Sequence, residues 1–204
     1  MEPPYRVTTE RLVVRCWEPR DAPRLKEAVD SSLEHLRPWM PWAADEPQTL
    51  AEKVALLRRF RGRFDLGQDY VYGIFDADES EVVGGTGLHT RAGDDALEIG
   101  YWIRASRVRQ GLATEATAAL TRVAFQVCGV DRVQIRVDPN NVPSQAIPRR
   151  LGFVEEARLR RRLPSRGSGP RDAIVFTLFL DNFAGSPPAS VPVQAYDALG
   201  ERVL

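Results

Sequence analysis

The sequence predicts an α+β fold, with a mixed, mostly antiparallel sheet of about seven strands and helices on both of its faces. The main observation is the order of hydrophobic patterns along the chain: strand, two helices, three strands, helix, strand, helix, two strands. The second is that 204 residues, 43% of them hydrophobic, suffice for one domain with a sizeable core. We therefore expect a single domain over residues 1–183 and a tail over residues 184–204.

The first quarter of the chain contains one strand pattern and two helix patterns. A strand is expected over residues 12–17, because Glu18-Pro19 follows this apolar run and interrupts it. Asp21 is a typical helix-capping residue, so a helix is expected from there to about Val29. A second helix is indicated by one apolar stripe at spacings of three and four residues, formed by Leu50, Val54, Leu57, Phe60 and Phe64.

The centre of the chain predicts three strands and then a long helix. The strands are expected over residues 70–75, 81–90 and 96–104, because polar, turn-forming residues separate these apolar runs. The helix is expected from Leu112 to near Gly129, because its apolar residues fall on one face.

The last part of the domain predicts a strand, a short helix and two further strands. Residues 132–137 alternate between polar and apolar side chains, and a short helix is expected around residues 143–150. The final strands are expected near residues 153–160 and 173–180, with a polar Gly/Ser connection between them. Residues from 184 onward include a Ser-Pro-Pro-Ala-Ser stretch and predict a tail with few packing partners.

Composition narrows the class of protein. The 28 basic and 28 acidic residues balance, which argues against general affinity for nucleic acid or for an anionic membrane. No run approaches the ~18 apolar residues of a membrane span, and the N-terminus lacks the features of a signal peptide. Cys16 and Cys128 lie in apolar runs without metal-ligand spacing, so we expect reduced thiols, no metal and a cytoplasmic location.

The most informative motif is the turn over residues 108–116, which opens the central helix after a strand. Unpaired N–H groups and the helix dipole at such a position favour an anion, and phosphate above all. Gly111 allows the backbone to come close to a ligand, and Ala113 keeps the next turn narrow. No Gly-Lys-Ser/Thr follows, and no Gly-x-Gly-x-x-Gly is present, so the turn predicts a diphosphate-bearing acyl carrier rather than a nucleotide triphosphate.

Five motifs in one order carry a family resemblance. They are Thr-Glu-Arg-Leu at 9–12, Leu-Arg-Pro-Trp-Met-Pro-Trp at 36–42, Glu-Ile-Gly-Tyr-Trp-Ile at 98–103, Gly-Leu-Ala-Thr-Glu-Ala at 111–116, and Asn141 and Ser144 with Leu-Gly-Phe at 151–153. Together they resemble the GNAT superfamily of acyl-CoA N-acyltransferases, in particular the branch that acetylates the N-termini of ribosomal proteins. The resemblance covers residues 7 to 183, nearly the whole predicted domain.

The resemblance implies acetyl-CoA as the cofactor and a set of residues that bind it. This set comprises Trp102, Ile103, Val108, Arg109, Gln110, Gly111, Leu112, Ala113, Thr114, Asn141 and Ser144. It also implies that the strand ending at Ile103 splays from the strand at 132–137, with the acyl arm in the gap and a backbone N–H as the oxyanion donor. Relatives often form homodimers, although the sequence itself is silent on oligomeric state.

Two positions depart from the family pattern. Val108 stands where the phosphate loop usually begins with Gln or Arg; backbone amides carry most of such contacts, and Arg109 can supply the charge. Pro148 stands where many members have a tyrosine that protonates the departing thiolate. Tyrosine acid chemistry from position 148 is therefore excluded.

Glu98 is the best candidate for the general base. It interrupts an apolar strand, and burial would raise its pKa towards that of a useful base. Strand alternation places Glu98, Gly100 and Trp102 on one face, which leaves space beside the carboxylate. Such a base removes a proton easily from an α-ammonium group, whose pKa is near ~8, and less easily from a lysine ammonium group, whose pKa is near ~10.4. The alternative is an exposed or ion-paired glutamate with a structural role.

Ser144 is the candidate group that meets the leaving sulphur, through its hydroxyl or through water. The alternative is that Ser144 caps the short helix. Pro148 removes the hydrogen bond that would reach the Ser144 carbonyl, so this turn is expected to be 3₁₀-like or kinked. Asn141 is expected to bind the pantetheine arm with its amide, or else only to shape the turn.

The remaining candidates concern the acceptor. Trp39 and Trp42 are expected to form walls of the acceptor pocket, with ordinary core packing as the alternative. His35 and His89 appear isolated, and neither supports a metal site or a Ser-His nucleophile. The arginine-rich run at 158–162 is typical of a solvated strand end, although it could also meet an acidic patch on a protein substrate.

These observations predict an acetyl-CoA-dependent N-acetyltransferase that acts by direct transfer in a ternary complex. Its acceptor is a primary amine, with the N-terminal α-amine of a ribosomal protein as one option and a small amine as the other: an amino acid, a polyamine or an aminoglycoside. A hypothesis from another class is a non-catalytic acyl-CoA-binding module, which only Val108 and Pro148 support.

Overall fold

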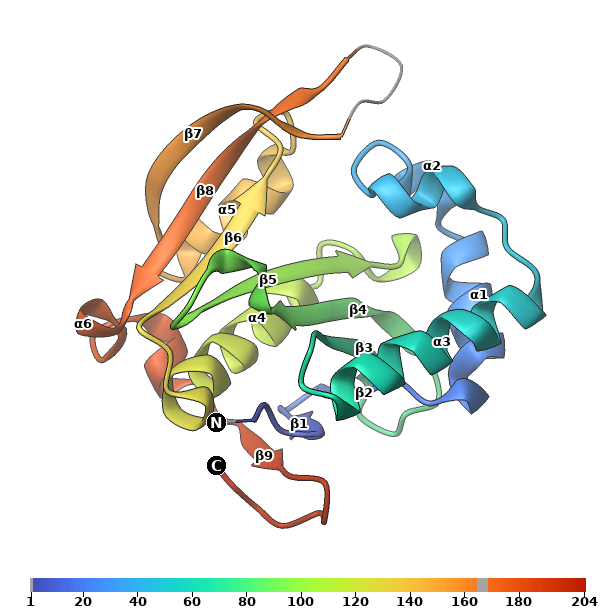
Figure 1. Ribbon diagram of the computed structural model, residues 1–204, viewed down its shortest axis with the longest axis horizontal. Coiled ribbons are helices and arrows are strands. Elements are labelled where there is room, and N and C mark those ends of the chain that lie inside the picture. The colour runs from blue at the N-terminus through green and yellow to red at the C-terminus, as the bar shows by residue number, and fades with distance from the viewer. Residues whose placement is uncertain (1, 165–168) are drawn as a thin grey trace.

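The computed structural model describes residues 2–164 and 169–204, and a single twisted sheet runs through this part of the chain (Figure 1). Nine strands follow the order β7-β8-β6-β5-β4-β3-β2-β1-β9, and every described neighbour is antiparallel except the β5–β6 pair. The strands are β1 Arg6–Thr8, β2 Leu12–Cys16, β3 Tyr70–Asp76, β4 Val82–His89, β5 Ala96–Ile103, β6 Arg132–Val137, β7 Val154–Leu163, β8 Arg171–Phe179 and β9 Gln194–Tyr196.

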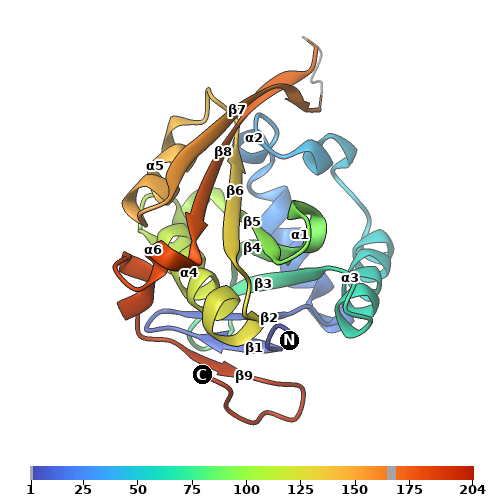
Figure 2. The ribbon, with the colours of Figure 1, turned by 60° about the vertical axis from the view of Figure 1, so that its left-hand side comes forward.

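Helices cover both faces of this sheet, and Figure 2 shows α4 and α5 on one side with α1 and α3 on the other. The helices are α1 Ala22–Asp30, α2 Leu33–Leu36, α3 Leu50–Asp65, α4 Leu112–Val123, α5 Val142–Arg150 and α6 Leu180–Phe183. One buried cluster packs around α4 and the sheet, and a second, smaller one includes residues of β2, β3, α1 and α3. The predicted α+β class and the mostly antiparallel sheet are confirmed.

The number of strands is higher than the sequence predicts, because two short strands extend the sheet beyond β2: β1 pairs with β2, and β9 pairs with β1 at the edge. Each has three residues, too few for a hydrophobic period to show. The expectation that residues from 184 onward have few packing partners is wrong. β9 pairs with β1, and Val193 and Ala195 are buried against the larger core.

Helix boundaries follow local capping chemistry. Thr49 caps α3: its hydroxyl accepts from the N–H of Glu52, and the Glu52 carboxylate accepts from the N–H of Thr49. α4 continues through a π-helical turn, Ala124–Cys128, and ends at Gly129 in a left-handed conformation. No helix in the two described ranges is long and apolar enough to cross a membrane.

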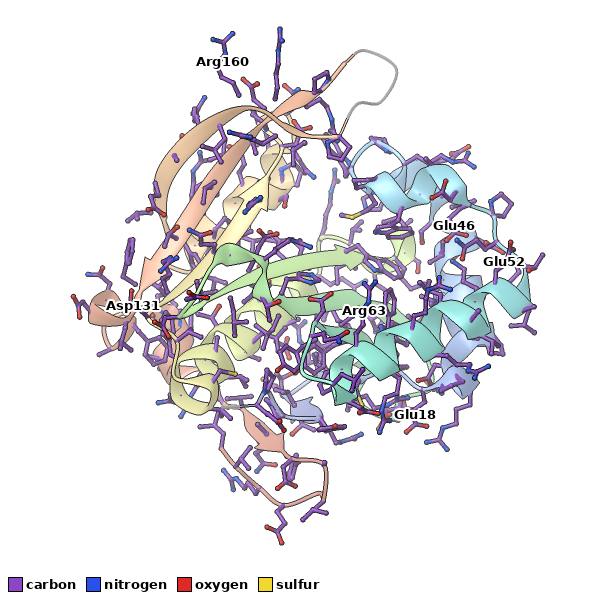
Figure 3. All side chains as sticks on the ribbon, in the orientation of Figure 1. Glu18, Glu46, Glu52, Arg63, Asp131 and Arg160 are labelled. Carbon is purple, nitrogen blue, oxygen red and sulfur yellow. The ribbon has the colours of Figure 1, made fainter. Side chains whose placement is uncertain are left out.

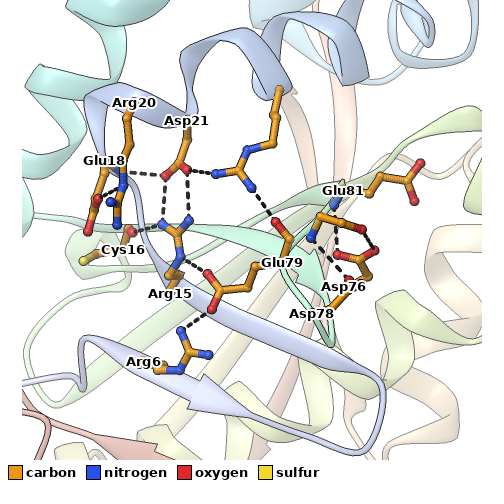
Figure 4. Close-up of polar contacts among 12 residues, drawn as sticks. Arg6, Arg15, Cys16, Glu18, Arg20, Asp21, Asp76, Asp78, Glu79 and Glu81 are labelled. Carbon is orange, nitrogen blue, oxygen red and sulfur yellow. Dashed lines mark hydrogen bonds and ion pairs between the residues drawn. The ribbon is translucent and has the colours of Figure 1, made fainter.

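An ion-pair network joins β1, β2, the start of α1 and the turn after β3 (Figure 4). Asp21 stands at the N-cap position of α1, but its carboxylate receives the Arg15 guanidinium at 2.8 and 2.9 Å instead of capping the helix. Glu79 bridges Arg15 and Arg6 at 2.5 and 2.6 Å. These contacts connect segments far apart in the sequence.

The strands β5 and β6 separate along their length, and this positions the candidate site. Their parallel pairing covers only three residue pairs, from Ala96 with Arg132 to Glu98 with Gln134. Beyond it β5 stays with β4 up to Ile103, whereas β6 stays with β8 up to Val137. The two strands therefore diverge (Figure 1), as the family resemblance implies, and the backbone of β5 beyond Glu98 faces no strand of the described residues on that side.

Candidate active site

The turn that opens α4 presents free backbone amides. Gly111 is the N-cap residue with φ 79° and ψ 0°, a left-handed conformation that glycine adopts without strain. The first helical bond described runs from the N–H of Glu115 to the carbonyl of Gly111, at 3.0 Å. In an α-helix the preceding N–H groups, those of Leu112, Ala113 and Thr114, have no helical acceptor. With the helix dipole, this donor set fits a diphosphate.

The side chains around this turn are of two kinds: one is apolar and packs on the core, and the others are polar and exposed. Val108 packs against the larger core, so its side chain contributes no polar group to the turn. Arg109 and Gln110 are exposed, and Arg109 also has a positive φ of 62°. The turn therefore offers amides and one exposed guanidinium.

A second arginine beside the turn was not among the sequence-predicted site residues. Arg11 donates to the carbonyl of Gln110 at 3.0 Å and to the carboxylate of Glu115 at 2.7 Å. The hydroxyl of Thr9 also donates to Glu115, at 2.6 Å. The Thr-Glu-Arg-Leu motif thus holds β2 against the first turn of α4, a role that the motif alone does not reveal.

On the far side of the diverging strands, α5 carries Asn141 and Ser144. The side-chain oxygen of Asn141 accepts from the N–H of Ser144 at 3.2 Å, so Asn141 caps the helix. The alternative that Ser144 is the cap is therefore wrong. The hydroxyl of Ser144 lies 3.1 Å from the hydroxyl of Tyr101, which extends from β5.

Tyr101 also compensates for Pro148. Because proline has no N–H, the carbonyl of Ser144 lacks its helical donor, and the Tyr101 hydroxyl donates to it at 3.1 Å. The expected 3₁₀-like turn does not form, since α5 is α-helical from Val142 to Arg150. Burial raises the pKa of Tyr101 to about 12, although its hydrogen bond with Ser144 opposes that rise, so the phenol stays neutral. Nothing in the sequence pattern around Tyr101 indicates this contact.

A cavity of about 650 Å³ lies on the face of the sheet that α1 and α3 cover. Its aromatic lining comprises Trp17, Trp42, Phe60, Tyr72, Tyr101 and Trp102. Trp42 and Trp102 meet edge to face, with ring centroids 5.8 Å apart. Trp39, the other predicted wall of the acceptor pocket, is not part of the lining that the described residues form.

Charged residues also line the cavity. Lys53 and Glu46 form a buried ion pair, and Figure 3 shows Glu46 on the segment that leads to α3. Arg160 lies at the outer end of β7 in the same figure and points away from the body of the molecule. The arginine-rich run is thus an exposed strand end rather than part of the cavity.

Glu98, the predicted base, is 3% exposed and held by two arginines. Its Oε1 receives the Arg91 guanidinium at 2.5 and 3.0 Å, and the Nε of Arg136 lies 2.9 Å from Oε2 without hydrogen-bond geometry. Strand register places Glu98 on the face of Gly100 and Trp102, as predicted, but Glu98 does not line the cavity. Its role as base stays a prediction.

His89, which appears isolated in the sequence, has a partner in the structure. Its Nδ1 lies 2.7 Å from Oδ1 of Asp69, and its ring lines the cavity. Burial alone would raise the pKa of Asp69, but the His89 hydrogen bond and nearby positive charges hold it below its ordinary value. Asp69 precedes β3 and His89 ends β4, so only the pairing of these strands brings the two together.

Comparisons with known proteins agree on one family. A family profile described as an acetyltransferase (GNAT) domain matches residues 11–154. The ribosomal protein uS5-alanine N-acetyltransferase of Escherichia coli is 31% identical over 160 residues, which cover 76% of this chain and 80% of that protein. The structure of Mycobacterium smegmatis RimJ in complex with CoA-disulfide has a TM-score of 0.81 at 25% identity, over 93% of this chain and 95% of that one. Ribosomal-protein-S5-alanine acetyltransferase from Vibrio fischeri, at 20% identity, shares the fold with a TM-score of 0.76 over 87% of this chain and 98% of that one.

Proposed function

The chain belongs to the GNAT family of acetyl-CoA-dependent N-acetyltransferases, and from that membership we propose that its acceptor is the N-terminal α-amine of a ribosomal protein. The observation that carries this proposal is the divergence of β5 and β6 between the amide-rich turn of α4 and a large aromatic cavity. A ribosomal acceptor is supported by the named activity of the Escherichia coli relative. That activity also supports a cytoplasmic location.

The geometry of the α4 turn and of the strands β5 and β6 suggests which residues would bind acetyl-CoA. Residues 108–114 would hold the diphosphate through their amides and the Arg109 side chain. The edge of β5 at Trp102 and Ile103, with Asn141 and Ser144 on α5, would line the pantetheine arm. Bound there, acetyl-CoA supplies an acetyl group activated as a thioester.

The acetyl group is transferred directly to the amine, without a covalent enzyme intermediate. Residues of the protein must then assist three steps: deprotonation of the amine, stabilisation of the oxyanion and departure of the thiolate. A base must remove a proton from the ammonium form of the acceptor before its nitrogen can attack. Backbone N–H groups of β5 beyond Glu98, which face no strand of the described ranges on the β6 side, would stabilise the oxyanion. Ser144 would donate to the departing thiolate, because its hydroxyl is not used for capping α5.

A panel of amines with acetyl-CoA and the purified protein tests the acceptor. We expect thiol release with peptides that carry a free N-terminal alanine or serine, and none with the same peptides once their N-termini are blocked. Release with amino acids, polyamines or aminoglycosides only would show that the acceptor is a small amine. Tight acetyl-CoA binding without release for any amine would instead identify a non-catalytic binding module. Light scattering of the same sample tests the homodimer that we propose by analogy with relatives.

A further inference from the structure

The imidazole of His89 lies next to two glycines in adjacent strands. Gly87 of β4 faces Gly100 of β5 in the antiparallel register. A Cβ atom at Gly87 would lie 2.7 Å from both Cε1 and Nε2 of His89, and one at Gly100 would lie 3.4 Å from Nε2. A side chain at position 87 would therefore displace the ring. The two glycines leave the space that this ring position requires.

Asp69 fixes which nitrogen of the ring is available. Since the carboxylate 2.7 Å from Nδ1 can only accept, we assign the proton of the neutral imidazole to Nδ1. Nε2 then carries a lone pair, and it receives no hydrogen bond from the described residues. The side chain is 15% exposed, and His89 is among the residues that line the aromatic cavity. A proton acceptor thus faces the space where an acceptor amine would enter.

Glu98 is less suited to take that proton. Both of its oxygens lie within ion-pair distance of an arginine, Arg91 or Arg136, and protonation of the carboxylate would weaken these pairs. Arg91 lines the cavity whereas Glu98 does not. An ordinary imidazole, in contrast, gains and loses its proton between about pH 5 and pH 8.

We propose that His89, oriented by Asp69, is the base that deprotonates the acceptor amine, an inference that rests on the proposed function. Nε2 accepts one proton from the ammonium group, directly or through one water, and the imidazolium later releases it to solvent. The nitrogen lone pair then forms the C–N bond while the carbonyl π pair moves to oxygen. The oxyanion pair then re-forms the C=O bond as the C–S bond breaks, and sulphur leaves with the electron pair of that bond. The nitrogen loses its second proton, and one proton reaches the thiolate, so that the products are an amide and a neutral thiol. Asp69 acts as a positioning residue.

Several charged groups face or surround this imidazole and belong in any account of its pH dependence. Asp69 contacts it directly, and Glu98 lies opposite it in the strand register with its charge held by Arg91. Arg59 of α3 also lines the cavity, and Arg63 of the same helix acts electrostatically on Asp69. Asp45 and the Glu46–Lys53 ion pair complete the charged part of the lining.

The test compares H89Q, D69N, E98Q and H35Q in the peptide assay. We expect H89Q to lower kcat about 100-fold or more, the usual contribution of a general base, and to leave the Kd for acetyl-CoA unchanged. Its residual rate should climb with pH as the free amine becomes neutral near pH ~8. D69N should lower kcat less, and E98Q should keep the pH profile of the wild type. H35Q is the matched control, because His35 is exposed on α2.

A spectroscopic readout keeps the inference testable if a variant fails to fold. The chain has only two histidines, so H35Q assigns the imidazole signals in ¹⁵N NMR spectra. The neutral ring of His89 should carry its proton on Nδ1, and its titration should coincide with the acidic limb of the wild-type rate profile. Wild-type rates and pH profile in H89Q, loss of that limb in E98Q, or an Nε2-protonated tautomer would each overturn the inference. Absence of turnover in the wild type would instead count against the proposed function.

Discussion

The hydroxyl of Tyr101 donates a hydrogen bond to the carbonyl oxygen of Ser144, 3.1 Å away, and lies equally close to the Ser144 hydroxyl. This contact joins β5 to α5 where β5 and β6 have already separated. It supplies the donor that Pro148 cannot provide, and it fixes the position of Ser144. Either hydroxyl can be the donor in the second contact, and when the phenol donates there the Ser144 proton is free for the thiolate.

Replacing Tyr101 by phenylalanine tests this arrangement. Y101F should lower the free energy of unfolding by about 1 kcal/mol, because the Ser144 carbonyl loses its hydrogen bond. It should also lower kcat, but less than S144A, which removes the donor itself. Urea unfolding and steady-state kinetics measure the two effects. Y196F is the control, because the Tyr196 hydroxyl bonds only an exposed glutamine among the described residues. Equal stability of Y101F and wild type would contradict the role given to the phenol.

Gly111 offers a second test, with Gly129 as its matched control. Both residues have a positive φ, 79° and 71°, so alanine at either position should cost about 1–2 kcal/mol of stability. Only G111A alters the turn that would bind the diphosphate, so only it should weaken coenzyme A binding, by about tenfold. Calorimetric titration and urea unfolding of both variants check this. A similar loss of affinity in G129A would show that general destabilisation is the cause.

The sequence predicts well those features that depend on local pattern. The α3 helix, the opening of α4 near Leu112 and its end at Gly129 are all in the structure, although Leu50 of the predicted α3 stripe is exposed. The site contacts that it misses join residues distant in the chain, such as His89 with Asp69 and Tyr101 with Ser144. Such contacts depend on which strands pair and in which register, and a single hydrophobic period does not determine either.

Trp42 is the predicted acceptor-pocket residue that reaches the cavity. W42A should raise the KM for a peptide acceptor by about three- to tenfold, because the cavity loses an aromatic wall that packs edge to face on Trp102, and an aromatic contact contributes about 0.5–1.5 kcal/mol. The Kd for acetyl-CoA should not change, since its expected site lies at the α4 turn and between β5 and α5. L66A is the control, because Leu66 is 71% exposed at the end of α3. A parallel change in both constants would show that Trp42 does not act on the acceptor alone.

Asp21 connects the stability of the fold to pH. Burial alone would raise its pKa, but hydrogen bonds from Arg15 and from the backbone N–H of Glu18, with the charges of Arg15 and Arg24, lower it overall. A carboxyl whose pKa is lower in the folded state than its unfolded value near ~3.9 contributes stability above that value. This contribution is lost as the pH falls through the folded pKa.

The D21A variant should therefore be less stable than wild type at pH 7 by about 3–5 kcal/mol, because Arg15 is left buried without this partner. The difference should begin to shrink below about pH 4, where Asp21 takes up a proton in the unfolded wild type while its carboxylate is still ionised in the folded state. Urea unfolding at pH 7, 5 and 3.5 measures this convergence. The surface variant E155Q, which removes exposed ion pairs with Arg149 and Arg158, should follow the wild type at neutral pH. If the plots of unfolding free energy against pH for D21A and wild type stay parallel down to pH 3.5, Asp21 is not the source of the acid sensitivity. Glu79 is then the next candidate, because Arg15 and Arg6 lower its pKa although burial alone would raise it.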